Sequence, residues 1–275
     1  MIETIIETKD YLTKSNLPAS DFVINPYIGC PHGCKYCYAC FMKRFTKHKE
    51  NWGDFIDIKY CSKSLNTKKI AGKSVFLSSV TDCYNIYETK YLVTQNILKQ
   101  LVGTDVELTI STKSKLILRD IDLLKKIKKL KVAISINTLN ENFKNDMDNA
   151  DSIIDRLHTL KELNKNGIYT VLFMSPIFPK ITNFKQLIQC SKTFVNEYWF
   201  ENLNLRGGYK ENILEYIYDN YPQYKELYDA IYRKNDYTYW QQLAIEIEKY
   251  CHDNSIKYCN FFYHDKLVQK KKTTK

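Results

Sequence analysis

The chain has 275 residues, of which 44% are hydrophobic and 26% charged, and its formal net charge is +10. A chain of this size and composition is typical of a globular protein of one or two domains that needs no disulfide framework. It has no apolar run of about 18 residues and no signal-peptide pattern, so we expect a cytoplasmic protein without a membrane span.

Strand-like and helix-like patterns alternate along most of the chain. Six apolar runs predict strands, at residues 22–28, 74–80, 106–111, 131–137, 168–178 and 198–205. Helical periodicity lies between them, at residues 90–101, 118–130, 151–167 and 183–195. Such repeats predict a parallel sheet covered by helices. Because six units are too few for a full eight-unit barrel, the expected fold is α/β, a partial (β/α)6 TIM-like barrel.

Two segments do not fit this repeat. Residues 41–73 form a long insertion, and residues 212–253 form a tyrosine-rich stretch with helical periodicity. A short apolar run at residues 256–264 is a candidate for a last strand. We therefore expect the barrel to occupy residues 1–210 and a helical C-terminal extension, packed on the barrel, to occupy residues 211–275.

Four of the nine cysteines lie close together, directly after the first predicted strand. Cys30, Cys34 and Cys37 have the spacing C-x3-C-x2-C, and Cys40 follows. An odd number of mostly scattered cysteines does not indicate a disulfide framework. A structural zinc site needs four ligands, usually from two separate C-x2-C pairs. Here the pairs Cys34–Cys37 and Cys37–Cys40 overlap and no second pair follows, and His32, which could complete a set, lies within the same tight loop.

An iron–sulfur cubane agrees better with this spacing. Cubanes are held by cysteine thiolates on a short loop, and three thiolates leave one iron open to bind another molecule. Gly29 and Gly33 allow the loop to wrap closely around a cluster, because glycine adopts backbone angles that other residues avoid. The C-terminal ends of parallel strands, where this loop lies, are also where such folds bind their ligands.

The C-x3-C-x2-C motif, with Tyr36 before its last cysteine, resembles that of the radical S-adenosylmethionine superfamily. The resemblance implies a [4Fe–4S] cluster held by Cys30, Cys34 and Cys37 in a loop at residues 30–37. It also implies that S-adenosylmethionine binds the open iron and is cleaved reductively to a 5′-deoxyadenosyl radical, which abstracts hydrogen from a substrate. A low-potential electron donor such as flavodoxin or ferredoxin is then expected.

Further motifs resemble the spore photoproduct lyase-like branch of this superfamily. They are "GCPHGCKYCY", "SSVTD", "TKS", "SINT" and "SPIFP", and they follow predicted strands. The resemblance implies S-adenosylmethionine-binding roles for Tyr36, Thr81, Asp82, Lys113, Ser135 and Asn137. Other segments, including "ENLNLRGGYK", resemble the radical SAM mobile pair proteins, which implies a second, paired radical SAM protein as a partner.

Two residues are candidates for a part in the radical chemistry. Tyr38 matches a tyrosine near the radical path of spore photoproduct lyase, although it is also suited to shielding the cluster from water. Cys83 is a candidate hydrogen donor or an ordinary packed thiol. The donor cysteine of the lyase lies three positions before the aspartate, where this chain has Ser79. Cys40 is not required by the motif and is expected to be a small side chain at the start of a helix rather than a spare thiol near the cluster.

The expected function is therefore that of a radical S-adenosylmethionine enzyme of lyase or oxidoreductase type. DNA or another nucleic acid is the substrate class that the positive net charge and the lyase resemblance favour, although dispersed lysines also simply keep a protein soluble. One alternative is modification of a peptide or protein together with the paired enzyme. The other is an iron–sulfur or zinc module without catalytic activity.

Overall fold

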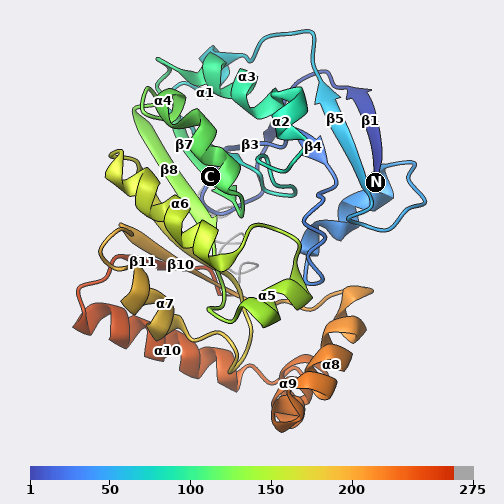
Figure 1. Ribbon diagram of the computed structural model, residues 1–275, viewed down its shortest axis with the longest axis vertical. Coiled ribbons are helices and arrows are strands. Elements are labelled where there is room, and N and C mark those ends of the chain that lie inside the picture. The colour runs from blue at the N-terminus through green and yellow to red at the C-terminus, as the bar shows by residue number, and fades with distance from the viewer. Residues whose placement is uncertain (263–275) are drawn as a thin grey trace.

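A curved sheet of eight strands forms the body of the molecule in the computed structural model, which describes residues 1–262 (Figure 1). Its strand order is β11-β10-β9-β8-β7-β6-β3-β2, and all neighbours are parallel except β2 and β3. The strands are β2 (Leu12–Lys14), β3 (Phe22–Ile24), β6 (Ser74–Leu77), β7 (Glu107–Thr112), β8 (Lys129–Ser135), β9 (Tyr169–Ile177), β10 (Glu197–Asn202) and β11 (Tyr258–Asn260). The predicted α/β class with a parallel sheet is confirmed.

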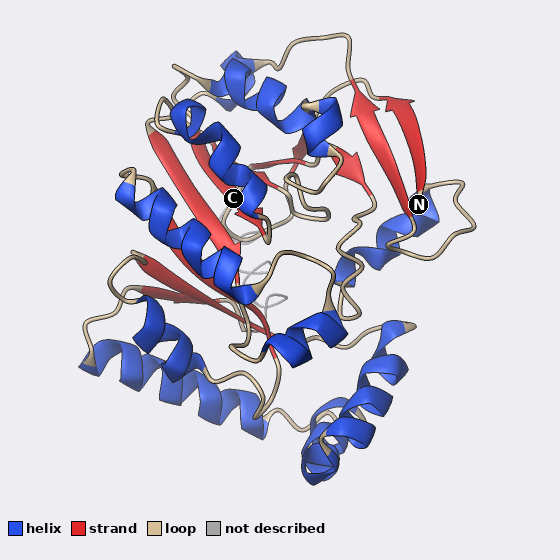
Figure 2. Ribbon diagram, in the orientation of Figure 1, coloured by secondary structure: helices blue, strands red, loops and turns tan. Residues whose placement is uncertain are grey.

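Helices cover one face of this sheet (Figure 2). The longer ones are α3 (Val93–Leu101), α6 (Ile153–Lys165), α7 (Phe184–Ser191) and α10 (Thr238–Asp253). Shorter turns connect them: α1 (Thr67–Ile70), α2 (Glu88–Tyr91), η2 (Lys115–Asp120), α4 (Ile121–Leu124) and α5 (Glu141–Met147). Side chains cap several helices, as where Ser152 accepts the Asp155 N–H at the start of α6. No helix among residues 1–262 has the length and apolar character needed to cross a membrane.

The two faces of the sheet differ because successive side chains of a strand point to opposite sides. The helix-covered face contributes residues such as Val132, Ile134 and Leu172 to the main core. The opposite, concave face has a smaller cluster around Ala133, Val171 and Trp199. Phe76, Tyr169, Phe173, Cys259 and Phe261 pack against this second cluster and are only partly buried.

A second sheet of three strands changes one prediction. It has the order β1-β5-β4, with β1 at Ile2–Glu7, β5 at Phe55–Tyr60 and β4 at Tyr27–Ile28. The single strand predicted at residues 22–28 is therefore wrong, because β3 and β4 belong to different sheets. The chain turns where the Asn25 side chain accepts the Val80 N–H (3.0 Å) and where Pro26 has no N–H to donate.

The C-terminal part of the described chain begins with α8 (Tyr209–Asn220), η3 (Pro222–Tyr224) and α9 (Lys225–Tyr232). After α10, β11 pairs in parallel with β10 and so extends the main sheet. This confirms a last strand at residues 258–260, while the end of the predicted run lies outside the described residues. The proposed division at residue 210 stays a prediction. Within residues 1–262 the sheet is open, since β2 and β11 do not pair with each other.

Candidate functional site

The loop that carries Cys30, Cys34 and Cys37 follows β4 at the carboxyl edge of the main sheet. Tight turns fold it, with N–H···O bonds from Gly33 to Cys30 (3.2 Å) and from Cys37 to Cys34 (3.0 Å). Gly29 has a φ of +91°, and a Cβ there would lie 2.3 Å from the Phe55 carbonyl oxygen. Only glycine is compatible with such a close approach, so the start of the loop is pressed against β5.

All three cysteines of the motif are free thiols that are buried or partly buried. Burial raises the pKa of Cys34 to about 12, although the Lys113 ammonium acts in the opposite direction. Burial also raises the pKa of Cys30, and the charges of Asp82, Cys34 and Cys37 add to this effect. The three sulfurs therefore influence one another, and a buried thiolate set of this kind needs positive charge, which metal ions supply.

The donor set fits a cubane better than a single ion. Among residues 1–262, no three His, Cys, Asp or Glu side chains are arranged to hold one metal ion. In a cubane each thiolate binds a different iron, so its ligands stand further apart than those of one ion. Backbone N–H groups of His32 and Ala39 are directed at the sulfurs of Cys30 and Cys37, as expected around a cluster.

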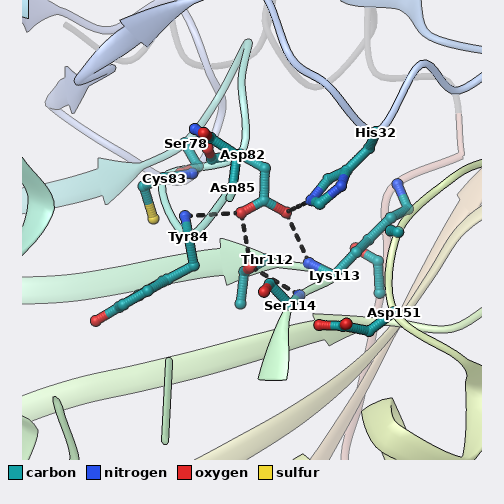
Figure 3. A network of polar contacts seen from close by, with 12 residues as sticks. His32, Ser78, Asp82, Cys83, Tyr84, Asn85, Thr112, Lys113, Ser114 and Asp151 are labelled. Carbon is teal, nitrogen blue, oxygen red and sulfur yellow. Dashed lines mark hydrogen bonds and ion pairs between the residues drawn. The ribbon is translucent and has the colours of Figure 1, made fainter. Parts of the chain in front are cut away.

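Asp82, directly after β6, is the centre of a polar network that joins three segments (Figure 3). Its Oδ1 accepts hydrogen bonds from Thr112 Oγ1 (2.7 Å) and the Tyr84 N–H (2.9 Å), and its Oδ2 accepts one from the Lys113 N–H (2.8 Å). The Nε2 atom of His32 lies 3.2 Å from Oδ2, but it has no conventional hydrogen-bond partner among the described residues. Asp82 thus connects the cysteine loop to the ends of β6 and β7.

The ionised form of Asp82 is favoured in this network. Burial alone would raise its pKa, but the charge of His32 and the donors of Thr112 and Lys113 lower the pKa to about 2. Because its oxygens already accept three hydrogen bonds, Asp82 is suited to holding the donating segments in position. Its neighbour Thr81 donates from Oγ1 to the Gly29 carbonyl (2.7 Å) and so holds the loop as well.

A second buried carboxylate, Asp148, lies after α5 on the other side of the loop. Its Oδ1 accepts a 2.6 Å hydrogen bond from Arg156 Nη2, and its Oδ2 accepts a 2.9 Å bond from the Tyr36 hydroxyl. The Lys144 ammonium is 3.8 Å from Oδ1. Arg156 also donates from Nη1 to the Ser135 carbonyl (3.2 Å), which ties the network to the end of β8. The sequence patterns did not single out Asp148, since an isolated acid has no distinguishing signal.

Lys113 lies between the two carboxylates. Its backbone N–H is bound to Asp82, and its Nζ is 5.3 Å from the centroid of the Tyr36 ring. Burial alone would lower the pKa of its ammonium, but the nearby charges of Cys34, Asp148 and Cys37 raise it. The ammonium is therefore kept charged beside two of the three cysteine sulfurs.

The remaining predicted residues lie at different places around the same edge. Ser135 and Asn137 are buried at the end of β8, and Asn137 Nδ2 donates to the Pro176 carbonyl (3.0 Å). Tyr38 is half exposed and donates from its hydroxyl to the Ser79 carbonyl. Cys83 is completely buried in the main core, and its N–H donates to Ser78 Oγ (2.8 Å). Its thiol therefore packs in the main core next to Asp82.

Comparison with known proteins gives relatives over most of the chain. An uncharacterized protein of Methanocaldococcus jannaschii is 38% identical over 224 residues, which cover 81% of this chain and 85% of that protein. An uncharacterized protein of Mycobacterium tuberculosis is 22% identical over 237 residues, which cover 78% of this chain and 68% of that protein.

Two solved structures have a similar fold. A spore photoproduct lyase variant, bound to AdoMet and a dinucleoside spore photoproduct, matches with a TM-score of 0.60 and 15% identity. The match covers 80% of this chain and 67% of the lyase. Streptococcus suis SuiB bound to S-adenosylmethionine matches with a TM-score of 0.55 and 15% identity, over 86% of this chain and 49% of SuiB. At these identities the likeness concerns the fold, a partial barrel.

The family profile of the Radical SAM superfamily matches residues 24–188, more than half of the chain. The matched span runs from β3 into α7 and contains the three motif cysteines, Asp82, Lys113 and Asp148. Members of this superfamily use a [4Fe–4S] cluster and S-adenosylmethionine, which agrees with the thiol set described above. The chain therefore belongs to the radical SAM superfamily, as its cysteine spacing predicted.

Proposed function

We propose that this chain is a radical S-adenosylmethionine enzyme whose cluster is held by Cys30, Cys34 and Cys37. The observation that carries the proposal is the trio of buried or partly buried free thiols on one tight loop at the carboxyl edge of an open parallel sheet. When bound, the reduced cluster supplies one electron to S-adenosylmethionine and so provides the radical that abstracts hydrogen from a substrate.

The chain's own residues have distinct roles in this proposal. The Lys113 ammonium offers a positive partner to the methionine carboxylate, because it stays charged next to Cys34 and Cys37. Ser135 and Asn137 line the end of β8, where they offer hydrogen bonds to the methionine or ribose. The Tyr36 ring lies beside the Lys113 ammonium, and this position next to the proposed methionine site supports a role for the Tyr36 backbone in binding the adenine.

Two predicted cofactor residues have a supporting role instead. Asp82 and Thr81 hold the cysteine loop against the strand ends through the bonds described above. Tyr38 follows Cys37 directly, is half exposed, and donates from its hydroxyl to the Ser79 carbonyl, which supports a part in shielding the cluster or in the radical path. The complete burial of Cys83 does not support a hydrogen-donor role, so we assign it to the core.

We further propose that the substrate is a nucleic acid. The concave face carries the partly exposed rings of Tyr169, Phe173 and Phe261, and two of them pack edge-on against the buried Trp199, Phe173 at 5.6 Å and Phe261 at 5.5 Å. Such rings suit stacking with bases, and a net charge of +10 suits a phosphate backbone. Modification of a peptide with a paired radical SAM protein is the second candidate, and a flavodoxin or ferredoxin is the expected electron donor.

Anaerobic reconstitution tests the proposal. The iron-loaded protein, given dithionite and S-adenosylmethionine, is expected to release 5′-deoxyadenosine. Cys37→Ser should abolish this product, whereas Cys40→Ser, a matched control outside the motif, should retain it. Absence of product from a fully loaded cluster would favour a non-catalytic iron–sulfur module.

The substrate class needs a separate experiment. We expect single-stranded DNA or RNA to bind with an affinity that falls steeply between about 50 and 200 mM salt, as counterion release requires. No binding at the lowest salt concentration would remove nucleic acid from the proposal. Specific co-purification of a second radical SAM protein, with crosslinks to this chain, would support the paired peptide-modifying enzyme instead.

A further inference from the structure

Trp52, in the turn before β5, has a buried indole nitrogen without a conventional hydrogen-bond acceptor in the described part of the chain. Its ring packs edge-on against Phe55, with 5.8 Å between the ring centroids. Phe55 is completely buried. A buried N–H donor without an acceptor is costly, so its retention calls for an explanation.

The backbone around Trp52 is pressed against the cysteine loop. Gly53 has a φ of +108°, and a Cβ built there would lie 3.1 Å from the Cα of Gly33. His48 fixes the same segment, since its ring stacks on Phe55 at 4.0 Å and its Nε2 lies 2.7 Å from Asp57 Oδ1. The glycine contact holds the turn that carries Trp52 against the cysteine loop.

The neighbour of the indole in this loop is Cys37. The backbone N–H of Ala39 and the indole N–H of Trp52 are both directed at the Cys37 sulfur. The other two thiols have different surroundings. Cys30 has the backbone N–H of His32, and Cys34 has the positive charges of Lys113 and Arg156. Among the main influences on these three thiols, a hydrogen bond from a side-chain N–H occurs only at Cys37.

We propose that the Trp52 indole N–H donates a hydrogen bond to the Cys37 sulfur when that thiolate holds iron, and thereby raises the reduction potential of the cluster. This inference rests on the proposed function. A cluster gains one negative charge on reduction, so a donor to a ligand sulfur stabilises the reduced state more than the oxidised state. Trp52 is a positioning and tuning residue in this scheme, since it acts through the cysteine.

A potentiometric titration of the reconstituted cluster, followed by electron paramagnetic resonance, tests the inference. In Trp52→Phe the aromatic packing stays but the N–H is lost. At a fixed ambient potential, we expect the ratio of reduced to oxidised cluster in this variant to fall about tenfold. This corresponds to a reduction potential lower by about 59 mV for a one-electron couple. Trp240→Phe is the matched control, because Trp240 lies in α10 and packs against Tyr239 and Phe262. The cluster of this control variant should have the reduction potential of the wild type. A Trp52→Phe cluster with the wild-type potential would overturn the inference.

A second measurement needs no variant and so does not depend on the folding of Trp52→Phe. The wild-type chain, labelled with ¹⁵N in its indole nitrogens, is expected to show ¹⁵N hyperfine coupling to the reduced cluster in pulsed electron paramagnetic resonance. A loaded and reduced cluster without this coupling contradicts the Trp52 hydrogen bond alone. Failure of the wild type to assemble any cluster would instead overturn the proposed function, and the inference with it.

Discussion

The two buried aspartates beside the cysteine loop hold it in different ways. Asp82 is surrounded mainly by neutral donors, two backbone N–H groups and a hydroxyl, with His32 beside them. Asp148 faces the full charge of Arg156, which is only 1% exposed, and of Lys144. A buried carboxylate can thus be stabilised by distributed dipoles or by an ion pair, and the two arrangements should respond differently to mutation.

Removal of the cation at Asp148 is expected to have the largest effect. Arg156→Met leaves the carboxylate buried without its main partner and frees the Ser135 carbonyl, so the free energy of unfolding should fall by about 3–5 kcal/mol. Urea denaturation of the apo protein measures this change. Adding Asp148→Asn to Arg156→Met should recover part of the loss. A single-variant cost below about 1 kcal/mol would show that the pair is unimportant.

Neutralising Asp82 should have a smaller effect. In Asp82→Asn the amide nitrogen must face one of the groups that donate to the carboxylate in the wild type. The free energy of unfolding is therefore expected to fall by about 1–3 kcal/mol at pH 7. Asp155→Asn, which removes a carboxylate paired with Lys115 at the surface, is the control and should cost under about 1 kcal/mol. Equal costs for the two variants would contradict the role of Asp82 as a network centre.

The acid side of the stability profile distinguishes Asp82 further. The pKa of Asp82 is lowered in the folded state from 3.8 to about 2, so its ionised form stabilises the fold above about pH 4. This contribution, about 2 kcal/mol, should be lost as the pH falls from about 4 to 2. Urea unfolding at several pH values should therefore show a shallower acid decline in Asp82→Asn than in the wild type. Parallel profiles for the two proteins would refute the lowered pKa.

Lys113 connects the two aspartates, and its variant should change ligand binding more than stability. Lys113→Met keeps the backbone N–H that binds Asp82 but removes the ammonium proposed to meet the methionine carboxylate. We expect S-adenosylmethionine to bind the cluster-loaded variant about tenfold more weakly, or about 1.4 kcal/mol. Equilibrium dialysis measures this, with the surface variant Lys115→Met as control. Unchanged affinity in Lys113→Met would exclude the proposed contact.

Local patterns were sufficient to predict much of the fold. Alternating apolar runs and helical periodicity gave the parallel sheet, because burial on two faces selects continuous apolar strands. The prediction failed at residues 22–28, where an apolar run reads as one strand although Asn25 and Pro26 break it. The second sheet was also missed, since pairing of β1 with β5 joins segments about fifty residues apart and leaves no local signal.

The sequence by itself was enough to predict the superfamily of this protein. The spacing of Cys30, Cys34 and Cys37 on a glycine-containing loop predicts three thiolates for one cluster, because ligand identity and reach are properties of a short segment. Only the tertiary structure decided which groups support that loop. Packing between distant elements makes Asp148, Arg156 and Trp52 neighbours of the loop. Burial, which no local pattern reveals, then strengthens the ion pairs and hydrogen bonds that these residues make.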